Sequence, residues 1–382
     1  MSMVLPNKGK ISALSFAHLL NDWYMNYIQT LLPFLVMAGL GVSKGAFLVS
    51  AFTITSSILQ PVFGYLVDQR NQRWMVYVGT LWMAVLISFI GVIDYYPLMV
   101  VIAALAGLGT AAFHPQASAM VSGVSGNRKG FFQACFTAAG NIGWALTPLM
   151  VVPFVQRYGL DLTPVYILPG VVVALLLWFF APRGLSKAKI APPPLLEVLR
   201  EAWAELTKVV TVVAFRSLAY FGLIAFLPLY LQSTNVSLVT SSKMLFVMLF
   251  AGAMGGITGG YFSDRIGRKA VIVISLLVAS PLFYLFITTS GLLSYVWLAL
   301  AGAALLASFS VTVVVAQEII SKNAAMASGL MLGFGVGIGG LGVGLFGIIA
   351  EQMGIAYTIH ILIWLPLFAG VFALLLKKDT KT

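Results

Sequence analysis

The sequence predicts an all-α integral membrane protein with twelve transmembrane helices in two pseudo-symmetric six-helix lobes. Three observations lead to this prediction. The 382 residues are 60% hydrophobic and 9% charged, with a mean hydropathy of +1.00, whereas a soluble chain of this length carries far more charge. The apolar residues form twelve runs of about 20 residues or more, enough to cross a hydrocarbon core about 30 Å thick. The second half of the chain repeats features of the first.

The repeat is clearest in a charged decapeptide that occurs twice. Residues 64–73 read GYLVDQRNQR and residues 260–269 read GYFSDRIGRK. Both begin Gly-Tyr, place an aspartate four residues after the glycine and end on basic residues before a new apolar run. At a similar offset Gly140 matches Gly335. Parallel repeats in a membrane protein indicate a two-lobed transporter that binds its substrate near mid-membrane between the lobes.

The expected lobes are residues 1–185 and residues 207–382. Between them, residues 186–206 form a cytoplasmic linker in which three prolines precede a short amphipathic helix over 195–206, expected to lie along the membrane face. The expected spans are 12–38, 45–67, 75–93, 98–121, 130–154, 161–181, 207–233, 242–262, 270–289, 294–317, 325–350 and 355–376. The first is expected to be a span rather than a signal peptide, because it lacks a small-residue cleavage site.

The basic residues predict the orientation. If both termini are cytoplasmic, only Lys44, Arg157 and Lys243 face outward and Arg216 lies within a span; the rest of the 22 Lys and Arg residues face the cytoplasm. This placement explains the net charge of +11 without a nucleic-acid partner. We expect a multi-pass protein of the cell (inner) membrane. A monomer is expected because one chain supplies both lobes.

The first span is the most polar. It contains His18, Asn21, Asp22, Asn26 and Gln29, and polar groups inside a membrane are costly enough to mark functional sites. His18, Asp22 and Gln29 share one helix face, and Asp22 lies roughly 15 Å from the cytoplasmic end. We interpret Asp22 as a proton-coupling site and His18, Asn21 and Gln29 as substrate-binding residues. The alternative is an aspartate satisfied by neighbouring helices.

The fourth span contains the sequence AAFHPQ at residues 111–116. Its proline frees a backbone carbonyl, so the kinked segment can line a cavity. Histidine changes charge near neutral pH, which makes His114 the second proton-coupling candidate, although a helix–helix hydrogen bond is a plainer interpretation. Gln116, Asn141 in the fifth span and Tyr220 in the seventh are further substrate-binding candidates.

Arg216 matches Asn21 at an offset of 195, so it should lie at a depth similar to that of Asp22. An arginine can hold an anionic group through two parallel hydrogen bonds, which predicts an anchor for a substrate anion. One alternative is an internal ion pair with Asp22 without a direct substrate role. In a third scheme, the substrate anion and Asp22 compete for Arg216.

The sequence gives no indication of catalysis. We find no metal-ligand spacing among the three histidines and the single Cys135, and no nucleophile–base arrangement. Residues 337–342 satisfy G-x-G-x-x-G, but they lie in an apolar run without the strand that a dinucleotide site needs, so close helix packing is the better interpretation. Neither an enzyme nor a metal or other cofactor is expected.

The two decapeptides resemble the signature loop of the major facilitator superfamily, which lies between spans two and three and between spans eight and nine. The second copy is the fuller match, whereas Gln69, Asn71 and Gln72 depart from it in the first. The number of spans, the duplication and the central loop extend the resemblance over the whole chain. It implies a cytoplasmic gate formed by Asp68, Arg73, Asp264, Arg265 and Arg268.

Within that superfamily, three stretches resemble the fosmidomycin-resistance type of efflux protein: residues 15–22 (SFAHLLND), residues 107–115 (GLGTAAFHP) and residues 216–231. The resemblance implies proton-driven export of small, often anionic or amphipathic compounds. Drug antiporters commonly carry an arginine in span four, four residues before the first glycine of a Gly-x-Gly pair. Ala103 occupies that position here, which favours His114 as a proton carrier.

We therefore predict a secondary active transporter that works by rocking-bundle alternating access. Its partners would be the lipid bilayer, protons and a small anionic or amphipathic substrate such as a drug or phosphonate, and the proton gradient would drive export. Two alternatives remain open at this point: uptake of an organic anion, and a substrate sensor on the same fold that does not translocate.

Overall fold

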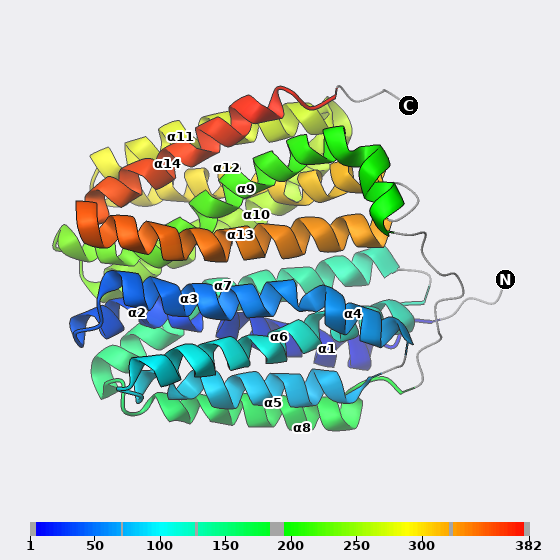
Figure 1. The fold of residues 1–382 in the computed structure, drawn as a ribbon, viewed down its shortest axis with the longest axis horizontal. Coiled ribbons are helices and arrows are strands. Elements are labelled where there is room, and N and C mark those ends of the chain that lie inside the picture. The colour runs from blue at the N-terminus through cyan, green and yellow to red at the C-terminus, as the bar shows by residue number, and fades with distance from the viewer. Residues whose placement is uncertain (1–4, 70–71, 127–128, 184–194, 321–323, 378–382) are drawn as a thin grey trace. The chain divides into compact units, whose positions relative to one another are not determined.

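The computed structural model describes residues 5–69, 72–126, 129–183, 195–320 and 324–377, and these residues form helices and connecting turns without a strand (Figure 1). Eleven helices within these ranges are long and apolar enough to cross a membrane, judged by length and composition. A helix satisfies its backbone hydrogen bonds internally, which a lipid environment requires. The chain forms two compact units, Met1–Lys189 and Ile190–Thr382, here called the N-lobe and the C-lobe.

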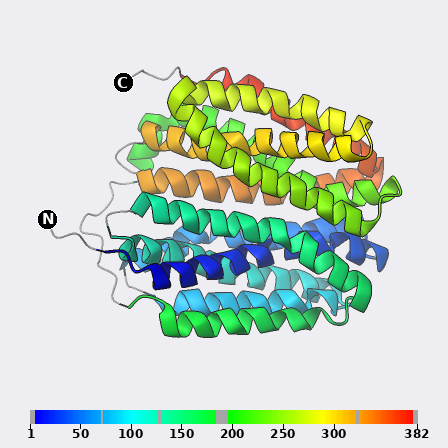
Figure 2. The same ribbon diagram turned by 180° about the vertical axis from the view of Figure 1, so that it is seen from behind.

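The N-lobe contains helices for all six predicted spans, and two of those spans are interrupted. Its helices are α1 (Lys8–Met25), α2 (Tyr27–Met37), α3 (Val42–Ile58), α4 (Gln60–Gln69), α5 (Trp74–Ser88), α6 (Tyr96–Val124), α7 (Lys129–Tyr158) and α8 (Ile167–Phe180), with 3₁₀ turns at η1 (Phe89–Gly91) and η2 (Thr163–Tyr166). The lobe's helices lie side by side in both Figure 1 and Figure 2.

Asn26 interrupts the first predicted span. It lies between α1 and α2 with φ −88° and ψ 0°, and its side-chain Nδ2 donates a hydrogen bond to the Trp144 carbonyl of α7, at 2.9 Å. The interruption divides the span into two pieces, and α1 buries several polar residues. The eleven membrane-length helices accordingly do not include this span.

The C-lobe is more regular. Its helices are α9 (Leu195–Ser233), α10 (Leu238–Ile266), α11 (Arg268–Thr288), α12 (Leu292–Ile319), α13 (Ala324–Met353) and α14 (Ile355–Ala373). The expected amphipathic helix over 195–206 is not a separate element but the first part of α9, since neither proline nor glycine interrupts residues 195–221. The three prolines before it lie outside the described residues.

Small residues bring the helices of the C-lobe into close contact, as is usual in membranes. A Cβ atom added to Gly255 or Gly259 of α10 would lie 2.1 Å from a carbonyl oxygen of α12, at Ala303 and Ala307 respectively. Gly339, within the G-x-G-x-x-G stretch, packs on Phe221 of α9, where an added Cβ would lie 2.2 Å from the ring. The interpretation of that stretch as a helix-packing surface is confirmed.

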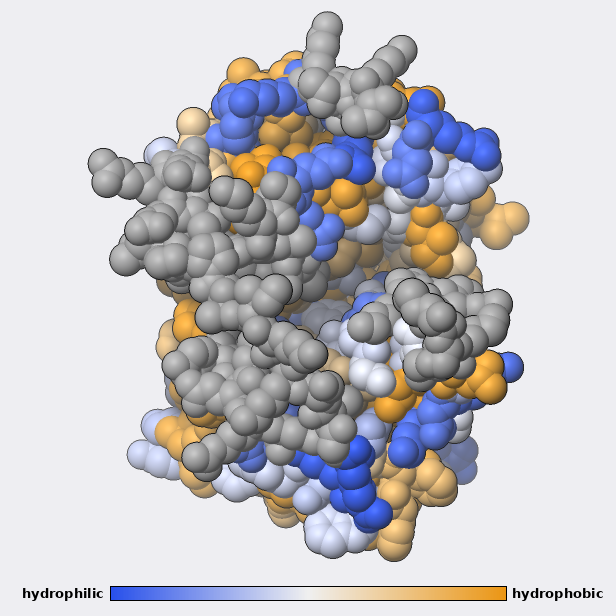
Figure 3. Space-filling view, turned by 90° about the vertical axis from the view of Figure 1, so that its right-hand side faces the viewer, coloured by the Kyte–Doolittle hydropathy of each residue, from blue (hydrophilic) through white to orange (hydrophobic). Residues whose placement is uncertain are grey.

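Hydrophilic side chains gather at one end of the N-lobe, on the face shown in Figure 3. In the N-lobe this end holds the start of α1 and the end of α6, joined by a hydrogen bond of 3.0 Å from the Asn7 amide to the Val124 carbonyl. The first decapeptide lies at the same end, where α4 stops and α5 begins. The charged repeats thus lie where helices end rather than within their apolar lengths.

Candidate functional site

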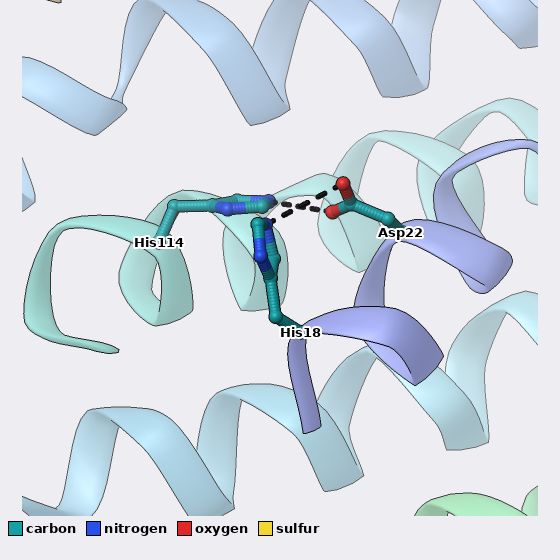
Figure 4. A group of neighbouring side chains, drawn as sticks. All are labelled: His18, Asp22 and His114. Atoms are coloured by element: carbon teal, nitrogen blue, oxygen red, sulfur yellow. Dashed lines mark ion pairs between the residues drawn. The ribbon is translucent and has the colours of Figure 1, made fainter. Parts of the chain in front are cut away.

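A buried cluster in the N-lobe brings both predicted proton-coupling residues together. Asp22 of α1 faces both His18, from the same helix, and His114 of α6 (Figure 4). His18 Nε2 is 3.4 Å from Asp22 Oδ2, and His114 Nε2 is 3.3 Å from Asp22 Oδ1. The i, i+4 spacing places His18 and Asp22 on one helix face, whereas His114 reaches them only through the packing of α6 against α1.

The orientation of His18 is fixed by α7. Its Nδ1 is 2.7 Å from the Phe136 carbonyl oxygen, and its ring stacks on the Phe136 ring with centroids 4.0 Å apart. A carbonyl only accepts hydrogen bonds, so Nδ1 carries the proton and Nε2 of a neutral His18 presents a lone pair toward Asp22. Two acceptors would then face each other unless a proton lies between His18 Nε2 and Asp22 Oδ2. A proton on either atom would remove this opposition of two acceptors.

His114 also approaches the carboxylate of Asp22. Its ring lies edge-on to His18, with centroids 5.0 Å apart, and its Nε2 is also 3.4 Å from the Met25 sulfur. The alternative interpretation of His114 was a hydrogen bond between helices. His114 does connect α6 to α1, but its contact is with the buried carboxylate of Asp22. The three side chains each bring one potential metal-ligand atom within 4.8 Å of the other two.

Gly140 of α7 forms the wall of this cluster. A Cβ atom at Gly140 would lie 2.4 Å from Asp22 Oδ2 and 2.9 Å from His18 Nε2, so a larger residue would force the carboxylate or the imidazole to shift. Sequence reasoning recognised Gly140 as part of the repeat but not as a site residue. The match of Gly140 with Gly335 was the sequence signal that could have identified it. Gly335 lies beside Arg216 in the equivalent helix of the C-lobe.

The other polar residues of the first span are buried and incompletely hydrogen-bonded. Asn21 Oδ1 accepts a hydrogen bond from the Thr110 hydroxyl of α6, at 3.1 Å. Among the described residues, no hydrogen-bond partner is found for Asn21 Nδ2, Asn26 Oδ1 or Gln29 Oε1. A buried polar atom without a partner is costly, and the concentration of such atoms between residues 21 and 29 is consistent with a hydrated or ligand-binding region.

Two predicted substrate-binding residues of the N-lobe lie elsewhere. Gln116 is fully buried, and its Oε1 accepts a hydrogen bond of 3.1 Å from the Gln72 backbone N–H, which ties α6 to the segment before α5. Asn141 is exposed and follows Gly140 on α7, outside the His18–Asp22–His114 cluster. The sequence around Pro115 correctly directed attention to α6, which carries His114. It did not predict that the Gln116 side chain points toward the segment before α5.

In the C-lobe, Arg216 of α9 is 2% exposed. Its Nη1 donates to the Thr312 hydroxyl of α12 at 3.2 Å, and its guanidinium lies 4.8 Å from the centre of the Phe309 ring. No carboxylate lies within ion-pair distance of Arg216 among the described residues of its lobe. Tyr220 follows one turn later on the same helix and is partly buried. Arg216 is thus held by neutral groups.

The predicted gate residues make contacts within their own lobes. Arg73 donates from Nε to the Ala181 carbonyl at 3.0 Å, and from Nη2 to the Trp178 carbonyl at the end of α8. Arg268 of α11 pairs with Glu318 of α12. The Arg265 guanidinium lies 4.0 Å above the Tyr261 ring, and Asp264 is exposed. The Asp68 side chain is outside the described part of the structure.

Lys269 is a site residue that sequence reasoning missed. Its ammonium group donates to the carbonyls of Leu374 and Leu376, both at 2.6 Å, just after α14. Arg73 makes the equivalent contact in the N-lobe, so each decapeptide ends on a basic residue that caps the carbonyl end of its lobe's last helix. Such carbonyls have no partner within their own helix. The sequence signal that could have indicated this role is that Arg73 and Lys269 occupy the same last position of the two decapeptides.

Comparisons with known proteins agree with this architecture. A family model described as Major Facilitator Superfamily matches residues 14–259. The fosmidomycin resistance protein of Escherichia coli (strain K12) is 30% identical over 383 residues, covering 97% of this chain and 93% of that protein. An uncharacterized MFS-type transporter of Bacillus subtilis (strain 168), YfnC, is 29% identical and covers 96% of this chain and 92% of its own length.

Solved structures share the fold. A bacterial homologue of the human lysosomal transporter Spinster, inward-facing and unoccupied, matches with a TM-score of 0.81 at 17% identity over 96% of both chains. The same homologue in an inward-facing, occupied conformation matches with a TM-score of 0.77 at 16% identity over 96% of this chain and 94% of that one. The predicted fold class is confirmed. The family match covers more than half of the sequence, and the chain therefore belongs to the Major Facilitator Superfamily of transporters.

Proposed function

We propose that this transporter exports a small anionic or amphipathic compound, such as a drug or phosphonate, in exchange for protons. The lobes would alternate access to a central site by rocking, as is general for this architecture. The observation that carries the proposal is Arg216, a buried cation without a carboxylate partner in its own lobe. The protein would act as a monomer in the cell (inner) membrane with both termini cytoplasmic, the orientation that its basic residues favour.

Arg216 supplies the anion site. An arginine at the centre of a membrane helix costs about 2.5–3.5 kcal/mol even on the lower insertion scales. The Thr312 hydroxyl and the Phe309 ring offset part of that cost but leave the positive charge unneutralised. A substrate oxyanion that accepts two N–H donors from the guanidinium would complete the site. Tyr220, one turn away, would line the same site.

The cluster around Asp22 supplies the proton site. A proton between His18 Nε2 and Asp22 Oδ2, which are 3.4 Å apart, would join the two groups, and His114 would offer a second position for that proton beside Oδ1. Asp22 would carry the coupled proton and His114 would exchange it with the aqueous side. His18, Asn21 and Gln29 would contribute to the adjoining cavity.

The name of one similar protein supports export over uptake as the direction of transport. The protein of Escherichia coli is named for resistance to fosmidomycin, and removal of a compound from the cell is a direct way for a transporter to give resistance. The cytoplasmic gate would use the decapeptide residues Asp68, Arg73, Asp264, Arg265 and Arg268, opening when the lobes rock apart on the inner side. No cofactor beyond the proton gradient is proposed.

Inverted membrane vesicles test the proposal. Vesicles with an acidic interior should accumulate a labelled phosphonate such as fosmidomycin, and a protonophore should abolish the accumulation. Vesicles from the same strain with an Asp22→Asn, Arg216→Ala double variant provide the background. Accumulation that is insensitive to the protonophore would contradict proton coupling. Saturable binding without flux would instead support a sensor, and movement only in the opposite direction would support uptake.

A further inference from the structure

The N-lobe cluster has a second chemical capability that does not rest on the proposed function. We propose that His18, Asp22 and His114, with Met25 as a fourth donor, bind one divalent transition-metal ion of the zinc, cobalt and nickel class. The sequence does not show this site, because the histidines are 96 residues apart and meet only when α6 packs on α1. The structure brings three donor atoms within 4.8 Å of one another.

Some of the distances between the donors are close to those around a tetrahedral ion. A metal bound at about 2.0–2.1 Å from each nitrogen or oxygen ligand places neighbouring ligand atoms about 3.3–3.4 Å apart. His18 Nε2 is 3.4 Å from Asp22 Oδ2, and His114 Nε2 is 3.3 Å from Asp22 Oδ1. His114 Nε2 is also 3.4 Å from the Met25 sulfur. Because the two histidines approach different oxygens of Asp22 and the three donor atoms lie within 4.8 Å of one another, the side chains would have to draw together around one ion.

The surrounding residues orient the donors as metal sites require. A ligating histidine normally donates its other ring N–H to a carbonyl or carboxylate, and His18 Nδ1 has such a partner in the Phe136 carbonyl, at 2.7 Å. The lone pair of His18 Nε2 therefore already points into the cluster. Asp22 Oδ1 is buried and has no hydrogen-bond partner among the described residues, and its contact with His114 Nε2, at 3.3 Å, is one that a bound cation would replace. Figure 4 shows both rings directed at this carboxylate.

The donor set selects the class of ion. Two imidazoles, one carboxylate and a thioether form a borderline-soft set that suits zinc, cobalt, nickel or copper. Calcium and magnesium require six or more oxygen ligands or several retained waters, and the cluster offers one carboxylate. Gly140 closes the side of the cluster next to Asp22 Oδ2, so the ion would lie on the side of Oδ1, toward His114 and Met25.

Cobalt(II) titration of the purified chain tests the site directly. The protein is prepared with an affinity tag that contains no histidine and is titrated with Co²⁺ in detergent, without substrate or proton gradient. We expect visible d–d absorption of a tetrahedral thioether and imidazole site, saturation at one Co²⁺ per chain, and its loss when Zn²⁺ is added. His114→Gln and Asp22→Asn should each weaken Co²⁺ binding at least about tenfold, and Met25→Leu should weaken it less.

The matched control is His360→Gln. His360, the third histidine, is exposed on α14, and its replacement should leave the Co²⁺ affinity unchanged. Thermal unfolding without metal shows which variants fold, and Met25→Leu keeps the volume of the side chain if a larger change fails to fold. Absence of d–d bands, or equal Co²⁺ affinity in the parent and all three cluster variants, would overturn the site. Because transport is not measured, failure of the proposed export would leave this result unaffected.

Discussion

The two lobes carry residues of opposite charge type at neighbouring positions of the internal repeat, Asp22 in the N-lobe and Arg216 in the C-lobe. At an offset of 195, Asn21 of α1 corresponds to Arg216 of α9, and Gly140 of α7 corresponds to Gly335 of α13. In each lobe the glycine lies beside the buried charged residue of the first helix, Asp22 or Arg216. Both lobes thus share a first helix packed on a glycine, but the charged residue beside that glycine is acidic in the N-lobe and basic in the C-lobe.

The difference lies in what surrounds each charge. Asp22 is enclosed by two histidines that can hold or release a proton, whereas Arg216 is held by a threonine hydroxyl and an aromatic ring. Positions occupied by His18, Asn26 and Gln29 in the N-lobe correspond to buried Val213, Phe221 and Ile224 in the C-lobe. Under the proposed function, the N-lobe would exchange protons and the C-lobe would bind the substrate anion.

Asp22→Asn should give the largest effect. The amide has the shape of a protonated carboxyl group, and its N–H can donate to the lone pair of His18 Nε2, so the cluster would stay in a state that resembles the proton-loaded one. Transport driven by a pH gradient should be abolished, while exchange of substrate for substrate is retained. Both are measured in proteoliposomes, with Asp94→Asn as a control because Asp94 is exposed between α5 and α6. Full gradient-driven transport by Asp22→Asn would end the proton-site assignment.

Arg216→Ala should have the next largest effect, on substrate binding rather than coupling. A charge-assisted hydrogen bond contributes about 1.5–3 kcal/mol, so an anionic ligand should bind at least about tenfold more weakly. Arg216→Lys should recover only part of the affinity, since lysine keeps the charge but loses the planar fork. Arg157→Ala, at an exposed position near the end of α7, is the control.

Scintillation proximity or calorimetric titration gives the affinities of these Arg216 variants. If Arg216 instead only neutralises Asp22 across the lobes, Asp22→Asn/Arg216→Gln should be more stable than either single variant, and ligand affinity should barely change. Unaltered ligand affinity in Arg216→Ala would remove the anion-anchor hypothesis.

Gly140→Ala and Gly335→Ala compare the lobes directly. An added Cβ at Gly140 would lie 2.4 Å from Asp22 Oδ2, whereas at Gly335 its nearest neighbours, the Ser217 hydroxyl and a Val213 methyl group, are 3.2 Å away. Overpacking typically costs about 1–3 kcal/mol, so Gly140→Ala should lower the melting temperature by several degrees. Both substitutions change helix propensity equally, so the difference between them isolates the packing. Equal melting temperatures would contradict the tight enclosure of Asp22.

Much of the fold could be predicted from the sequence, because each membrane span is marked by a long apolar run and the two lobes are marked by the internal repeat. The contact of His18 with Asp22 was also predictable, since it depends only on helix periodicity. The contact with His114 was not, because it depends on how α6 packs on α1, and neither was the role of Gln116, whose direction is set by the backbone N–H of Gln72. The interruption at Asn26 was not predictable either, because no proline or glycine lies beside it, and the hydrogen bond of Asn26 to the Trp144 carbonyl joins it to another helix.

The smallest expected effects concern the basic caps that end the two decapeptides. Arg73→Gln should free the carbonyls of Trp178 and Ala181, and Lys269→Gln those of Leu374 and Leu376. A hydrogen bond of this kind contributes about 1 kcal/mol net, so each substitution should loosen the last turn of α8 or α14 alone. Hydrogen exchange of the backbone amides in those turns, measured by mass spectrometry, should rise about fivefold in the affected lobe and stay unchanged in the other.

Arg265→Gln serves as the control for both caps, because Arg265 lies on the Tyr261 ring and no described hydrogen bond joins it to a helix-end carbonyl. The same variants separate the cap from the proposed gate. If Arg73 only caps α8, then Arg73→Gln should change exchange in α8 while the rate of substrate exchange stays close to that of the parent. If Arg73 also closes the cytoplasmic side, the transport rate should change far more than the local loosening explains, and cysteine labelling from the cytoplasm should increase. Unchanged amide exchange in α8 would show instead that the Arg73–carbonyl contacts add nothing to the stability of that helix end.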